Sequence, residues 1–161
     1  MGREFLGEHK IIHLSTDAMR DRTDTAWASD VIHMAEYQDI LFIIDWTSGV
    51  GADEISVQRC DDVTPTSTAG LPGGRYRYST TPDVWTAWAA IATSSGFITP
   101  ITPDKTYEIH VRADEIGGSS GWEYIRLNTD EITNNPVDVD MIAILFNPRY
   151  GEDIDPVSSI T

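Results

Sequence analysis

The sequence predicts an all-β protein, a β-sandwich or jelly roll of roughly eight to ten antiparallel strands with an extended N-terminal arm. Two observations lead to this prediction. Short apolar or alternating segments recur along the chain, and clusters of Gly, Pro, Ser and Asn separate them. No segment shows the periodicity of a long helix, and no internal repeat is visible.

A hairpin in the N-terminal half organises the chain. Residues 40–44 are all apolar and rich in β-branched types, which predicts a strand covered on both faces. The turn at 47–51 contains glycines that let the chain reverse. The returning segment, 53–60, alternates, with Ile55 and Val57 on one side and polar residues on the other. Such alternation is expected of a strand with one face in water.

Later segments show the same two patterns. Residues 105–112 alternate most cleanly, and Tyr107, Ile109 and Val111 are predicted to face the core. Residues 82–92 fit a helix or a strand by spacing, and the short turn before them favours a strand in a hairpin. Further predicted strands lie at 75–79, 97–98, 122–128 and 137–146, the last apolar throughout from position 141.

The chain is predicted to divide into an N-terminal arm (1–22), a β-sandwich domain (23–150) and a C-terminal tail (151–161). At 161 residues it is long enough for one domain with a real core. The positive and negative charges of the arm balance, and its apolar patch consists of Ile11, Ile12 and Leu14. This pattern fits either an arm that docks on another subunit or the first edge strand of the sandwich.

The chain is strongly acidic, with 26 Asp and Glu residues against 11 Lys and Arg, a formal charge of −15. Because nucleic-acid backbones require a basic surface, we expect no nucleic-acid partner. No segment approaches the ~18 apolar residues of a membrane span, so we expect no membrane partner either. The charged N-terminus does not fit a signal peptide, which predicts synthesis in the cytoplasm.

Motifs that carry chemistry are absent from the sequence. It contains no nucleophile elbow and no phosphate-binding loop, so we expect a non-enzymatic protein without catalytic residues or cofactor. Cys60 is the only cysteine, which excludes an intramolecular disulfide. No metal site is expected, because metal-ligand spacing is missing among the four histidines, His9, His13, His33 and His110.

The order of several short segments carries a resemblance to a known group of proteins. These segments are residues 37–45, 54–62, 76–78, 85–88, 107–111 and 124–127, with the run AILFNPRY at 143–150 closing the series. From about residue 23 to residue 150, the chain resembles small virion structural proteins of tailed bacteriophages, similar to head decoration or cement proteins. The first 22 residues have no counterpart in this pattern.

The resemblance implies a β-sandwich that binds the outside of a capsid, with no cofactor and no turnover. The major capsid protein is then the expected partner, the capsid surface of the virion the expected location, and a homotrimer the expected oligomer, since capsid lattices offer threefold positions. The residues predicted to contact the capsid or another subunit are Ile11, Ile12, Leu14, Arg149 and Tyr150. Two alternatives stay open, a neck or tail component of the virion and a carbohydrate-binding module that uses Trp85, Trp88 and Trp122.

Overall fold

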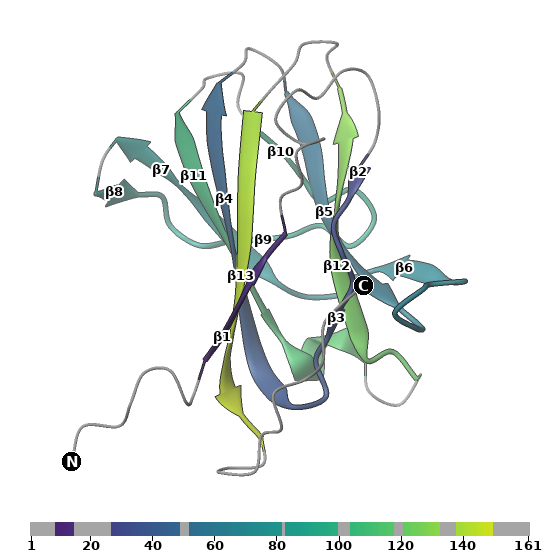
Figure 1. The fold of residues 1–161 in the computed structure, drawn as a ribbon. Helices are drawn as coiled ribbons and strands as arrows, with labels where there is room; N and C mark the ends of the chain where they lie inside the picture. Colours follow the sequence, from purple (N-terminus) through teal and green to yellow (C-terminus); the bar gives the residue numbers. More distant parts are fainter. Residues whose placement is uncertain are drawn as a thin grey trace, which may run out of the picture.

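The computed structural model describes residues 9–14, 27–48, 52–81, 83–99, 104–117, 121–132 and 138–149. Over these ranges the chain forms two antiparallel sheets that face each other as two layers (Figure 1). The helical structure in these ranges is a single turn, the 3-10 helix η2 (Ala113–Ile116). The predicted all-β sandwich is therefore confirmed.

The first sheet has seven strands among the described residues. Across the sheet they are β1 (Lys10–His13), β13 (Asp138–Pro148), β4 (Tyr37–Ser48), β11 (Lys105–Arg112), β7 (Arg75–Thr81) and β8 (Val84–Trp85), and β9 (Ala89–Ala90) also pairs with β7. The second sheet has six strands in the same ranges. They are β10 (Phe97–Ile98), β5 (Asp53–Cys60), β12 (Tyr124–Glu131) and β2 (Trp27–Ala28), with β3 (Ile32–His33) on β12 and β6 (Thr68–Gly70) on β5. Where one strand was predicted over residues 82–92, the described part of this segment contributes two strands of two residues each and no helix.

The core lies between the two sheets and is made by alternate residues of each strand. In β11 the predicted inward residues Tyr107, Ile109 and Val111 are all fully buried. Ile125 and Leu127 of β12 face them from the other layer and are buried to the same extent. Burying such apolar side chains, at about 25 cal/mol per Å², is the main favourable contribution to folding.

The central strand β4 differs from the prediction in two respects. The predicted hairpin with the returning segment 53–60 is wrong, because β4 is paired with β11 and β13 whereas β5 lies in the other sheet, so the chain crosses from one layer to the other after β4. The second difference concerns the outer face of β4. Ile40, Phe42 and Ile44 are 0% exposed, whereas Leu41 and Ile43 between them are only half-buried. The prediction that both faces are covered is wrong, because the sandwich has two layers and the outer side of β4 faces away from the other sheet.

The apolar patch near the N-terminus includes an edge strand. β1 pairs antiparallel with β13, with Ile11 opposite Ile144 and Ile12 opposite Ala143. The backbone N–H of Leu14 then donates to the carbonyl of Met141 at 2.9 Å. For residues 10–13 the edge-strand alternative is the one that the structure shows. The rest of the predicted arm, apart from residues 9 and 14, and the predicted tail lie outside the described residues.

Candidate functional site

Five aliphatic side chains lie on the outer face of the seven-stranded sheet, away from the core. We call them the aliphatic strip. Residues paired directly across an antiparallel ladder share a face, so the register brings these side chains together in two neighbouring rows. The rows are Ile11–Ile144–Leu41 and Ile142–Ile43. Ile11 is 58% exposed and the other four are half-buried.

The outer face of the other sheet has a different composition. There the paired positions of β5 and β12 are polar, and the ladder sets Arg126 opposite Gln58 and Asn128 opposite Ser56. The Nε of Arg126 donates to the Oε1 of Gln58 at 2.9 Å. The outer face of the six-stranded sheet is therefore polar, whereas the outer face of the seven-stranded sheet carries apolar side chains that water solvates poorly.

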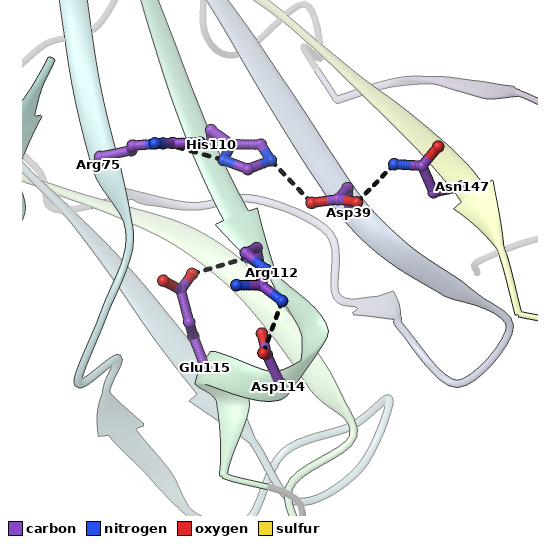
Figure 2. A network of polar contacts seen from close by, with 7 residues as sticks. All are labelled: Asp39, Arg75, His110, Arg112, Asp114, Glu115 and Asn147. Carbon is purple, nitrogen blue, oxygen red and sulfur yellow. Dashed lines mark hydrogen bonds and ion pairs between the residues drawn. The ribbon is translucent and has the colours of Figure 1, made fainter.

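A chain of hydrogen bonds crosses the outer face of the first sheet beside the aliphatic strip (Figure 2). The Nε of Arg75 donates to the Nδ1 of His110 at 3.2 Å. The ring proton of neutral His110 then lies on Nε2, which donates to Oδ1 of Asp39 at 2.9 Å. Asn147 donates to the other oxygen of Asp39 at 2.7 Å. The four side chains come from β7, β11, β4 and β13, so the chain of bonds fixes four adjacent strands to one another.

Local conformation places the members of this network. Asn147 has a φ of 55°, a left-handed conformation that Asn tolerates better than most residues. Beside the network, the Nη2 of Arg112 lies 2.8 Å from a carboxylate oxygen of Asp114. The backbone N–H of Arg112 donates to the Glu115 carboxylate at 2.8 Å, which satisfies an N–H at the start of η2. These two interactions join the last residue of β11 to the 3-10 helix η2 that follows it.

Arginine side chains of β7 and nearby tryptophan side chains lie beyond β11, one strand away from the aliphatic strip. The guanidinium carbon of Arg77 lies 4.8 Å from the ring centre of Trp85 and 4.7 Å from that of Trp88. Arg75 lies 5.3 Å from the Trp88 ring. We call these four residues the arginine–tryptophan ladder. Arg77 also forms a 2.6 Å ion pair with Glu108, so the ladder is anchored to β11.

A pocket of about 190 Å³ opens at the end of the sandwich where η2 closes the core. Its lining residues are Met34, Ala35, Ala113, Ile116, Trp122, Glu123 and Arg149. Arg59 packs over the Trp122 ring at 5.2 Å and donates to the Ile116 carbonyl at 3.3 Å, which fixes one wall. The pocket is small and its rim carries both charge signs.

The structure separates the residues that the sequence predicted as interface. Ile11 lies on the exposed face, whereas Ile12 packs against the core and Leu14 is buried within it at 1% exposure. Arg149 is exposed on the rim of the pocket. Tyr150 lies outside the described residues. That any of these residues contacts a capsid stays a prediction.

The sequence analysis did not identify the remaining four members of the aliphatic strip. Leu41 and Ile43 belong to the apolar run 40–44, and Ile142 and Ile144 to the run 141–146. The first run is predicted to be covered on both faces, and the second run lacks the alternation that would mark an exposed face. Their position on an outer face follows from the predicted sandwich, because a two-layer sandwich leaves one side of each run without a covering layer.

We next consider whether the described residues include a reactive thiol or a metal site. Burial raises the pKa of the Cys60 thiol, which disfavours the reactive thiolate. Within these ranges, no three His, Cys, Asp or Glu side chains gather as the ligands of a metal ion would. The same ranges contain no helix of the length and apolarity that crossing a membrane requires.

The chain was compared with known families, curated proteins and solved structures. No family model matches the chain. No curated protein matches it in sequence either. Among solved structures, the chain is similar to the SPBc2 prophage-derived protein YomS, with a TM-score of 0.45 and 9% identity over 87% of this chain and 94% of that chain. A similarity at this level carries no inference about function.

Proposed function

We propose that this protein is a non-enzymatic structural protein of a tailed-phage virion, which decorates the outside of the head through protein–protein contacts. The observation that carries the proposal is the aliphatic strip on the outer face of the seven-stranded sheet. A contiguous exposed apolar patch rimmed by polar groups is typical of a protein interaction site. The decoration role itself comes from the resemblance described above.

The polar surroundings of the strip support contact with a folded partner. Interfaces combine an apolar centre with a polar rim and with Arg and Trp residues that contribute strongly to binding. Here the arginine–tryptophan ladder lies one strand beyond the strip, on the far side of β11, and the Asp39–His110–Arg75 network holds the strands in place. Because these side chains fix one another, the face is preorganised, which lowers the entropy cost of binding.

The alternative of a carbohydrate-binding module gains no support from the geometry. Sugar binding needs open aromatic ring faces. The Arg77 guanidinium lies over the rings of both Trp85 and Trp88, and the Arg59 guanidinium lies over the ring of Trp122. A neck or tail location would use the same outer face, and it differs from decoration only in the partner.

The proposal is tested by binding of the purified protein to phage heads stripped of it. Ile11→Asp places a charge in the aliphatic strip at a position that is 58% exposed, so the fold should tolerate it. Losing the burial of one isoleucine, about 1.5–3 kcal/mol, should weaken binding by roughly 10- to 100-fold.

The matched control is Ile98→Asp. Ile98 is also an isoleucine on a strand and is 62% exposed, but it lies on the other sheet. We expect this variant to bind like the unaltered protein. If Ile11→Asp binds stripped heads as well as Ile98→Asp does, the proposed role of the outer face is wrong.

A further inference from the structure

The pocket at the η2 end of the sandwich combines an apolar floor with a charged rim. The floor is formed by buried or half-buried side chains, namely Met34, Ala113, Ile116 and Trp122. The rim carries two exposed charged residues, Glu123 and Arg149. None of these residues belongs to the aliphatic strip or to the arginine–tryptophan ladder, so the pocket is a separate feature of the molecule.

The volume of the pocket limits what it can hold. At about 190 Å³ it is larger than an engineered cavity of ~150 Å³ that binds one benzene molecule. It is smaller than the ~300–1,000 Å³ that is typical of sites for drug-sized ligands. An occupant that fills the pocket is therefore about one amino-acid residue in size, with an apolar side chain against the floor.

Arg149 is a cation without a carboxylate partner. Among the described residues, the arginines that form ion pairs are Arg77 and Arg112. The backbone N–H of Arg149 donates to the Glu36 carbonyl at 2.8 Å, which fixes the residue at the rim of the pocket. Its guanidinium group can therefore bind a carboxylate of another molecule, for which its planar set of donors is well suited.

Glu123 suits the nitrogen of the same occupant. Its Oε2 lies 3.3 Å from the Nε2 of His33, and its side chain is 63% exposed, so the carboxylate can accept a further hydrogen bond. Next to the floor, the Arg59 guanidinium lies over the Trp122 ring and donates to the Ile116 carbonyl, which holds the apolar wall in place. An apolar α-amino acid presents the matching combination of side chain, N–H donor and carboxylate.

We infer that this pocket binds a single apolar amino-acid residue with a free carboxylate, with the side chain on the floor, the carboxylate at Arg149 and the nitrogen at Glu123. Two sources share this chemistry, the C-terminal residue of another protein chain and a free amino acid. The inference does not depend on the proposed function, because the pocket and the outer face use different residues.

NMR titration of the isotope-labelled full chain with N-acetyl-leucine tests the site. This compound mimics a chain end, and a ligand of its size should bind with a Kd of about 1 mM. The indole N–H signal of Trp122, identified by its absence in Trp122→Phe, should shift on binding. N-acetyl-leucinamide has no carboxylate charge and should bind about fivefold more weakly or worse.

Arg149→Gln is the decisive variant. It should bind the acid and the amide equally weakly, so that the preference for the carboxylate disappears. The matched control is Arg126→Gln, which should keep the preference, because Arg126 is also outside the ion pairs of the described residues but lies on the outer face of the six-stranded sheet. Ala35→Leu enlarges a lining residue and should weaken binding of acid and amide alike. Circular dichroism confirms that each variant is folded.

Leucine itself separates the two sources. Tighter binding of N-acetyl-leucine than of leucine supports a chain end, and the reverse order supports a free amino acid. The inference is overturned if neither compound shifts the Trp122 signal at about ten times the expected Kd. It is also overturned if Arg149→Gln keeps the preference for the acid over the amide.

Discussion

Replacing Tyr107 with Phe should stabilise the protein. The Tyr107 ring is 0% exposed and packs against Trp46, Tyr78 and Phe97. Its hydroxyl is buried and has no hydrogen-bond partner among the described residues. Leaving such a group unsatisfied costs about 1–3 kcal/mol, whereas removing it with an otherwise identical ring leaves only a small void. We expect Tyr107→Phe to raise the free energy of unfolding by about 1 kcal/mol at pH 7.

The effect should grow at alkaline pH. Burial, followed by the nearby Tyr78 and Tyr76, raises the pKa of Tyr107 above its usual value of 10.0. As pH rises above that value, Tyr107 of the unfolded chain loses its proton before the folded chain does. The unfolded state then binds fewer protons, so stability falls with increasing pH by up to about 1.4 kcal/mol per pH unit from this residue. Tyr107→Phe should lack this contribution.

Urea unfolding at pH 7 and in steps from pH 9 to 11 measures both effects. The midpoint should rise at pH 7 without a change in the denaturant slope, and the difference between variant and unaltered protein should widen above pH 10. Tyr124→Phe, on the outer face of the other sheet, is the control for the pH 7 comparison. A variant that is destabilised by more than about 1 kcal/mol at pH 7 would refute the reasoning, because it would mean that the hydroxyl is bonded.

Three further tests probe the core, the network and one turn. Phe42→Ala and Leu145→Ala should each cost about 2–5 kcal/mol in urea unfolding, since both side chains are fully buried, and near-neutral effects would contradict the packing described. Asp39→Ala removes the acceptor of two hydrogen bonds and should lower stability by about 1.5–3 kcal/mol in thermal unfolding, whereas no shift in melting temperature would show that the network is dispensable. Gly96→Ala should be more destabilising than Gly121→Ala, because both glycines have positive φ but only at Gly96 would a Cβ lie 2.0 Å from the Ile55 carbonyl oxygen; equal effects in urea unfolding would contradict this.

Period-two patterns in the sequence predicted which residues of β5, β11 and β12 enter the core. Tyr107, Ile109 and Val111 alternate with polar residues, and the pleat of a strand converts such alternation directly into burial. The apolar runs 40–44 and 141–146 lack this alternation. A side chain such as Leu41 has the same local sequence signal whether another layer, another molecule or water covers it, so its position could not be predicted.

Long-range pairing limited the prediction of the candidate site. Asp39, Arg75, His110 and Asn147 are far apart in sequence and meet only because β7, β11, β4 and β13 are neighbours in the sheet. The directions of the side chains in the N-terminal apolar patch could not be predicted from the sequence either. Ile11 and Ile12 point to opposite faces of β1, and Leu14 enters the core just after the strand ends. Removal of residues 1–22 would therefore also remove core packing.

Site-specific photo-crosslinking in assembled virions tests most directly whether the outer face is covered by protein. A photoreactive amino acid at position 43, in the aliphatic strip, is compared with the same amino acid at position 58, on the outer face of the other sheet. Both strands are central in their sheets, so the two sites are equivalent in the fold. Irradiation should join position 43, but not position 58, to another protein chain of the virion. Equal labelling of both positions, or none at position 43, would contradict a protein-binding role for the outer face.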